Sequence, residues 1–125
     1  MRIIVKIGGT VAEDAAVTES LLQELKHHAG SAVLVHGGGK AVTRISERFG
    51  ITPIFADGVR VTSPAEMELV DMVLAGRVNT ELVRLAHRMG VAAVGLTGAD
   101  SSMLSGQLVG DPTQNRTATV DHVSP

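Results

Sequence analysis

Short apolar runs that end in glycine-rich turns are the feature that most constrains this chain of 125 residues. Residues 3–7 (Ile-Ile-Val-Lys-Ile) lead into Gly8-Gly9, and residues 32–35 (Ala-Val-Leu-Val) lead through His36 into Gly37-Gly38-Gly39. Runs this short, rich in β-branched residues and almost unbroken in apolar character, are typical of buried strands in a parallel sheet. The pattern therefore predicts α/β units in which a strand ends at a glycine turn.

Amphipathic segments follow these two strands. Residues 15–28 and 40–49 carry apolar side chains at helical spacing, and residues 64–89 repeat them every three or four positions. Ser63 and Pro64 predict a capped start for the long helix, with Glu66 completing a capping box. Strands that alternate with helices predict an α/β fold, here a three-layer αβα sandwich with a mainly parallel sheet.

The remaining segments are less regular. Residues 51–62, with the Asp57-Gly58 pair, predict a hairpin or an ordered loop. Residues 91–94 predict a third strand, and Leu108-Val109 and Val120 mark possible short strands in the polar tail. Because Ser124-Pro125 ends the sequence without a closing helix, we expect a fold that is incomplete at the C-terminus and belongs to a longer protein.

Composition excludes several classes of protein. The net charge of −2 and the presence of only two aromatic residues argue against a nucleic-acid binder, which needs a basic surface and stacking side chains. No apolar run approaches the roughly 18 residues of a membrane span, and no signal peptide opens the chain, so we expect a cytoplasmic protein without membrane association. Cysteine is absent, and the five histidines lack metal-ligand spacing, so no metal site is expected.

The two glycine turns are candidates for binding an anion. Glycine lets backbone N–H groups face a phosphate closely, and a helix that starts behind the turn adds its positive dipole end. Ligands of open α/β sheets bind at the carboxyl ends of the strands, where both turns are expected. One such turn alone is more often only a tight connection, but two on neighbouring strands favour phosphate binding. Neither turn fits the dinucleotide-binding fingerprint or the P-loop.

Two cations stand out beside these turns. Lys6 interrupts a strand that should be buried, so it either reaches water at the strand end or lies over bound phosphates. Arg60 precedes the capped helix and is either an ordinary surface arginine or a two-pronged clamp for a carboxylate.

Five segments stand in order along the chain: Lys6-Ile-Gly-Gly, Val35-His-Gly-Gly-Gly, Asp57-Gly-Val-Arg-Val-Thr, Met72-Val-Leu-Ala-Gly-Arg-Val-Asn and Ala93-Val-Gly-Leu-Thr-Gly. Taken together, they resemble the amino acid kinase family, in the branch that phosphorylates N-acetyl-L-glutamate. The resemblance runs from residue 2 to about residue 100, and family members are longer, with a second half that binds most of the ATP. The segment Gly98-Ala99-Asp100-Ser101-Ser102 departs from the family's usual glycine-lysine-aspartate-glycine.

The resemblance implies a reaction and a division of the chain. The whole enzyme would transfer the γ-phosphoryl group of ATP, with Mg²⁺ and without a prosthetic group, to the side-chain carboxylate of N-acetyl-L-glutamate in arginine biosynthesis. Residues 1–125 would form the N-terminal domain that binds this acceptor, and the ATP-binding C-terminal domain would be absent. A homodimer through residues 64–89 is also implied.

The resemblance further assigns roles to individual residues. Lys6 matches the lysine that stabilises the transition state, and Arg60 matches the arginine that holds the α-carboxylate of the substrate. The phosphate-binding positions are Gly8, Gly9 and Gly37, and the substrate-binding positions are Gly38 and Gly39.

Two alternatives remain open from the sequence. One is a kinase for a related acyl amino acid, such as an aminoadipate derivative. The other is a non-catalytic fragment that binds a small ligand or dimerises, because 125 residues without an ATP-binding half are expected to be inactive alone.

Overall fold

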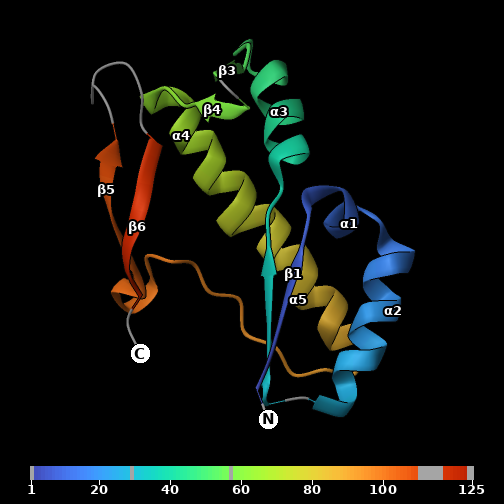
Figure 1. Cartoon of the computed structure of the whole chain (residues 1–125). Helices are drawn as coiled ribbons and strands as arrows, with labels where there is room; N and C mark the ends of the chain where they lie inside the picture. Colours follow the sequence, from blue (N-terminus) through green and yellow to red (C-terminus); the bar gives the residue numbers. More distant parts are fainter. Residues whose placement is uncertain (1, 29, 57, 110–116, 124–125) are drawn as a thin grey trace.

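Two parallel strands form the centre of the structure (Figure 1). The computed structural model describes residues 2–28, 30–56, 58–109 and 117–123. Strand β1 (Ile3–Ile7) pairs with β2 (Ala32–His36), so that Ile7 lies opposite His36. The connection runs through helix α1 (Gly9–Glu13), helix α2 (Ala15–Leu25) and the short 3₁₀ helix η1 (Lys26–His28). Both predicted strands and the helix between them are confirmed.

Helix α3 (Gly39–Arg48) and a long helical segment complete the helical part. The long segment consists of α4 (Pro64–Asp71), the π-helical stretch η2 (Met72–Val78) and α5 (Asn79–Arg88). It starts as predicted, because the backbone N–H of Glu66 donates to Oγ of Ser63 (3.2 Å) and Pro64 occupies the first turn. The carboxylate of Glu66, however, does not complete the capping box, since it bonds to other side chains instead.

The core lies between the helices, on one side of the sheet. In one cluster, α3 packs against η2 and α5, and in the other α2 packs against α5. The buried residues of the first cluster are Ala41, Val42, Val73, Val78 and Leu82. Those of the second are Leu22, Leu85, Ala86 and Val91.

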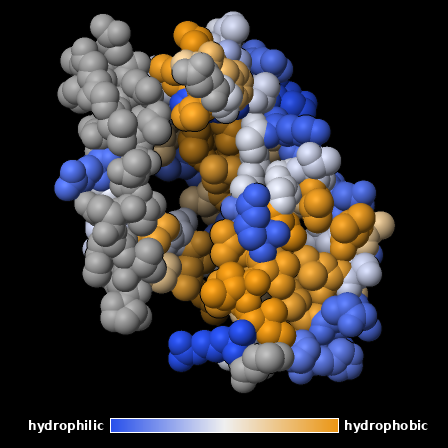
Figure 2. All heavy atoms as spheres, viewed as in Figure 1, coloured by the Kyte–Doolittle hydropathy of each residue, from blue (hydrophilic) through white to orange (hydrophobic). Residues whose placement is uncertain are grey.

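The other side of the β1–β2 sheet is open and apolar. Ile4 is 74% exposed, Val33 55% and Val35 46%, and Figure 2 shows hydrophobic residues gathered over this region. The α/β fold with parallel strands is confirmed. Within the described residues, helices cover only one face of the sheet, so these residues supply two of the three layers of the predicted sandwich.

The predicted third strand at residues 91–94 is wrong, because the end of α5 takes the hydrogen-bonding groups that a strand needs. The N–H of Val91 donates to the carbonyl of Ala86 (2.9 Å), and that of Gly90 to the carbonyl of His87 (3.0 Å). This pair of bonds, with Gly90 at φ +74°, is a Schellman helix end. The carbonyl of Ala93 accepts from Nε2 of His87 (3.0 Å). Residues 91–97 therefore form an irregular segment.

Two antiparallel hairpins account for the remaining strands. β3 (Ile54–Ala56) pairs with β4 (Val59–Val61), which confirms the hairpin predicted within residues 51–62. β5 (Leu104–Val109) pairs with β6 (Thr117–Val123), and both short strands predicted in the polar tail lie within them. In the part of the chain that the structure describes, no helix is both long and apolar enough to cross a bilayer.

Ser101 and Ser102, shortly before β5, both have a positive φ of 52°. In the 3₁₀ turn η3 (Asp100–Ser102), Ser101 adopts φ 52° and ψ 25°, the left-handed region that disfavours side chains other than glycine. The left-handed conformation costs an L-residue roughly 1–2 kcal/mol. A change to glycine removes this strain, but glycine loses more entropy on folding, which offsets about half of the gain in stability.

We expect Ser101→Gly to raise the free energy of unfolding by about 0.5–1 kcal/mol, because glycine adopts this conformation without strain. Ala99→Gly is the matched control: φ there is −76°, so glycine brings only its entropy cost of about 0.5–1 kcal/mol. Chemical denaturation of both variants measures the difference. If Ser101→Gly is as destabilising as Ala99→Gly, the strain at residue 101 does not exist in solution.

Candidate functional site

The two predicted glycine turns lie in contact. The parallel register of β1 and β2 brings Gly8-Gly9 beside the turn that follows His36. A Cβ atom built on Gly9 would lie 3.3 Å from the backbone N of Gly39 and 3.4 Å from Cα of Gly38. Two main-chain segments that approach this closely form one continuous surface of backbone groups at the carboxyl ends of the strands.

The second turn is pressed against the long helix. Gly38 precedes α3 and its carbonyl accepts from the N–H of Val42 (3.0 Å). A Cβ on Gly38 would lie 2.6 Å from Cδ2 of Leu74 in η2, so a glycine permits the close approach of turn and helix. Cβ atoms on Gly8, Gly37 and Gly39 would meet nothing within 4 Å. The outer side of the turns is thus open for a ligand.

Lys6 lies near the end of β1, two residues before Gly8, and is exposed. Its position opposite Val35 places it on the open face of the sheet, with Ile4 two residues earlier on the same strand. Its ammonium group forms no ion pair with any carboxylate among the described residues. The structure therefore brings a cation without a described counter-ion close to the first glycine turn.

Arg60 reaches from β4 to the second glycine turn. Nη2 donates to Oγ1 of Thr43 (2.6 Å) and, over a longer distance, to the carbonyl of Gly39 (3.4 Å). Nη1 donates to Oε1 of Glu66 (2.6 Å), and the guanidinium lies 4.8 Å from the ring centre of Phe55. With 15% of its side chain exposed, Arg60 is not the surface arginine that the sequence left open.

Glu66 is the residue of this site that sequence analysis assigned only to a helix cap. It is 2% exposed, and Oε1 also accepts from Oγ of Ser46 (3.3 Å), which is fully buried. A carboxylate at the third position of a capped helix matches the capping box so well that the pattern masked its contact with Arg60. The available signal was an arginine six residues earlier, on a segment predicted to fold back as a hairpin.

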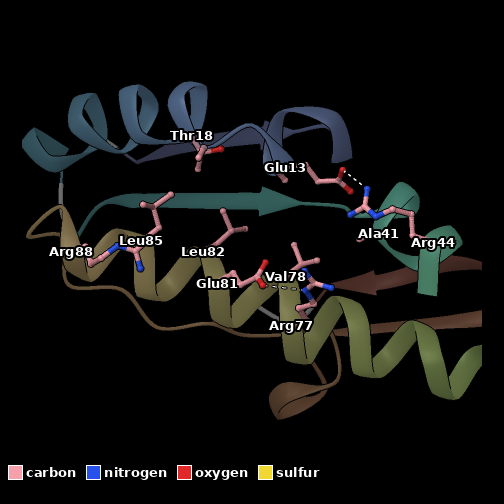
Figure 3. Close-up of a pocket in the computed structure, with 12 residues that line it drawn as sticks. Glu13, Thr18, Ala41, Arg44, Arg77, Val78, Glu81, Leu82, Leu85 and Arg88 are labelled. Atoms are coloured by element: carbon pink, nitrogen blue, oxygen red, sulfur yellow. Dashed lines mark hydrogen bonds and ion pairs between the residues drawn. The ribbon is translucent and has the colours of Figure 1, made fainter. Parts of the chain in front are cut away.

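A separate cavity of about 380 Å³ opens among α1, α2, α3 and the η2–α5 segment (Figure 3). Leu82 and Leu85 line it, with the ion pairs Glu13–Arg44 (2.8 Å) and Glu81–Arg77 (3.1 Å) at its edge. The hydrogen bond and charge of Glu13 raise the pKa of Arg44. Neither glycine turn nor Arg60 lines this cavity, so it is distinct from the predicted substrate site.

The described residues contain no group of three or more His, Cys, Asp or Glu side chains placed to hold a metal ion. Asp100, in the turn after the segment Gly95–Gly98, is engaged locally instead. It accepts from the backbone N–H and the hydroxyl of Thr97, and these hydrogen bonds lower the pKa of its carboxyl. Asp100 thus serves as a turn-stabilising side chain in this structure.

One family model covers nearly the whole of this α/β chain, including both glycine turns. The model of the amino acid kinase family matches residues 1–124, and this chain belongs to that family.

Two curated relatives within this family are acetylglutamate kinases. The acetylglutamate kinase of Prochlorococcus marinus subsp. pastoris (strain CCMP1986 / NIES-2087 / MED4) is 35% identical over 127 aligned positions, covering 99% of this chain and 45% of the relative. The acetylglutamate kinase of Synechocystis sp. (strain ATCC 27184 / PCC 6803 / Kazusa) is 40% identical over 106 positions, covering 82% of this chain and 36% of the relative. The chain thus spans less than half the length of these relatives.

Solved structures confirm the fold. The protein smu.665 from Streptococcus mutans UA159 superposes with a TM-score of 0.84 at 25% identity, covering 98% of this chain and 50% of that protein. N-acetylglutamate synthase from Neisseria gonorrhoeae, solved with coenzyme A and N-acetyl-glutamate, gives a TM-score of 0.71 at 19% identity, covering 98% of this chain and 28% of that protein. The second likeness concerns the fold alone.

We expect Glu66→Ala to lower the free energy of unfolding by about 3 kcal/mol. Removing one member of a buried ion pair leaves the other without its counter-ion, and Arg60 can recover only part of its hydration. Glu68→Ala, an exposed glutamate on the same helix, should change the free energy by less than about 0.5 kcal/mol. Equal effects in urea unfolding would show that the Arg60–Glu66 contact contributes nothing special.

Proposed function

We propose that the full-length protein is an acetylglutamate kinase and that this chain forms the part that binds the acceptor substrate. The proposal is carried by one observation: the two glycine turns touch, and Arg60 reaches the second of them. Relatives named acetylglutamate kinase, at 35–40% identity, support the choice of reaction within the family.

The acceptor chemistry fits a site without a general base. A side-chain carboxylate is ionised at neutral pH, so it can attack the γ-phosphorus of ATP without losing a proton first. The oxygen–phosphorus bond to ADP breaks as the new bond to the carboxylate forms, giving an acyl phosphate. Catalysis then depends on aligning two anions and on offsetting charge as the phosphoryl group moves.

In this proposal, different residues bind the phosphoryl group and stabilise its charge. Backbone N–H groups of the glycine turns and the first turn of α3 would hold phosphoryl oxygens, since a helix N-terminus favours anions. Lys6 would stabilise the transferring group from the open face of the sheet. ATP would bring Mg²⁺ on its phosphates, and the rest of the protein would bind most of the nucleotide. A homodimer through residues 64–89 belongs to the same proposal.

Arg60 would hold the α-carboxylate of acetylglutamate. A two-pronged contact uses Nη2 together with either Nη1 or Nε, because of the fixed fork of the guanidinium. Nη2 is bonded to Thr43 and Gly39, and the Gly39 contact is the longer at 3.4 Å. We infer that the substrate carboxylate replaces the carbonyl of Gly39, which would couple acceptor binding to the glycine turn.

The proposed function is tested with ATP, N-acetyl-L-glutamate and hydroxylamine, which traps an acyl phosphate as a coloured hydroxamate. We expect ATP-dependent hydroxamate from the full-length protein, and Lys6→Ala should lower kcat by at least about 100-fold, the scale of one preorganised charge contact. Lys26→Ala, in η1 away from the turns, is the matched control and should keep full activity.

The same assay with N-acetylated aminoadipate in place of acetylglutamate decides between the two acceptors. Hydroxamate from neither acceptor, with the protein folded by circular dichroism, would contradict a kinase function. A normal kcat in Lys6→Ala would show that Lys6 has no catalytic role.

Arg60 variants separate binding of the acceptor from phosphoryl chemistry. The α-carboxylate does not react, so its contact is equal in the ground and transition states and its loss raises KM without lowering kcat. Arg60→Ala should raise the KM for acetylglutamate roughly 10- to 150-fold, the range for a hydrogen bond to a charged group. Arg60→Lys should recover only part of this, and the KM for ATP should hardly change.

Steady-state kinetics with each substrate varied separately measure these constants on folded variants. A fall in kcat at constant KM for acetylglutamate would make Arg60 a catalytic group rather than a substrate clamp.

A further inference from the structure

Glu66 is a buried ionisable side chain for which the proposed chemistry has no use. Its side chain is 3% exposed, and both of its side-chain hydrogen bonds go to Oε1, from Arg60 (2.6 Å) and from Ser46 (3.3 Å). Its own backbone N–H is fixed by Ser63 at the start of α4. The carboxylate is therefore anchored by its helix and by α3, and it is presented to a single cation.

Arg60 is the more exposed partner of this pair. It lies on the three-residue strand β4, and its side chain is 15% exposed against 3% for Glu66. Three of its five N–H groups have acceptors, namely Glu66, Thr43 and Gly39, which leaves one on Nη1 and one on Nε. Of the three acceptors, only Glu66 carries a charge, so it makes the strongest of these contacts.

Loss of that charge would free the guanidinium. A buried cation without a counter-ion is costly, and a long side chain at a partly open site can lower the cost by turning towards water. Thr43, the carbonyl of Gly39 and the Phe55 ring at 4.8 Å are uncharged and are weaker restraints. The arginine would then leave the second glycine turn for part of the time.

We propose that Glu66 is a positioning residue for Arg60: it holds the guanidinium against Thr43 and the second glycine turn, in the orientation that receives the substrate carboxylate. The statement that Arg60 receives the substrate carboxylate rests on the proposed function. The statement that Glu66 fixes the orientation of Arg60 does not. Glu66 itself touches no substrate atom, and all of its effect passes through Arg60.

The decisive variant is Glu66→Gln in the full-length protein, because glutamine keeps the size and an acceptor oxygen, loses the charge and carries an NH2 group in place of the other oxygen. A charged hydrogen bond is roughly twice as strong as a neutral one, so we expect the KM for acetylglutamate to rise about fivefold with kcat and the KM for ATP unchanged. Glu68→Gln, exposed on the same helix, should leave all three constants unchanged. A lower KM in Glu66→Gln would overturn the proposal, since Glu66 would then oppose the substrate.

A double-variant cycle separates positioning from a general effect on the fold. If Glu66 acts only through Arg60, adding Glu66→Gln to Arg60→Lys should change the KM for acetylglutamate much less than it does in the wild type. If the KM of the double variant instead rises by the product of the two single-variant factors, the proposal is overturned. Should Glu66→Gln fail to fold, Ser46→Ala removes the other hydrogen bond to Oε1 and should raise the same KM by a smaller factor.

Nuclear magnetic resonance of the arginine side chains tests the holding of Arg60 without any substrate. A fixed guanidinium gives separate Nη proton signals and a freely rotating one gives an averaged signal, and the Arg60 signals are assigned by their loss in Arg60→Lys. We expect separate signals in the wild type and in Glu68→Gln, and averaging in Glu66→Gln. Unchanged signals in Glu66→Gln would overturn the proposal even if acetylglutamate is a substrate. If the wild type has no kinase activity, the proposed function fails and these spectra alone decide the role of Glu66.

Discussion

The ion pair between Arg60 and Glu66 links three elements that the chain forms separately: β4, the start of α4, and α3 with the glycine turn before it. The two charges lie six residues apart, whereas Thr43 and Gly39 come 17 and 21 residues before Arg60. The network can therefore be complete only after the hairpin and both helices have packed. Buried ion pairs add little net stability, because desolvation offsets attraction, but breaking one is costly. The pair consequently favours one placement of the hairpin over others.

Sequence analysis predicted the elements whose causes are local. The strands before the glycine turns, the Ser63 cap and the hairpin within residues 51–62 follow from spacing and turn chemistry within a few residues. The third strand was predicted wrongly because Val91 gives its N–H to the end of α5, and apolar periodicity cannot reveal a competing acceptor. Apolar runs of this kind become strands only when a neighbour offers hydrogen bonds, and among the described residues none does so here.

Only part of the candidate site was predictable from the sequence. Contact between the two turns follows from the rule that parallel strands carry their carboxyl ends to one edge, and the structure confirms it. The enclosure of Arg60 was not predictable, because it depends on where Ser46, Thr43 and Phe55 lie once the helices have packed. Sequence spacing placed Glu66 in a capping box, and only the tertiary structure directs its carboxylate to an arginine. The catalytic and binding roles of the glycines, Lys6 and Arg60 remain predictions.

The two cations at the turns differ in how their charge is balanced, and this difference bears on their proposed roles. Arg60 is largely neutralised by a carboxylate at 2.6 Å, so it contributes direction and hydrogen bonds more than long-range field. Lys6 has no ion pair among the described carboxylates and lies on the apolar face of the sheet, beside Val35. Charge acts over a longer range where water is excluded, so covering this face would strengthen the field of Lys6 at the turns. A balanced cation suits a substrate carboxylate that never reacts, and an unbalanced one suits a phosphoryl group whose charge shifts during transfer.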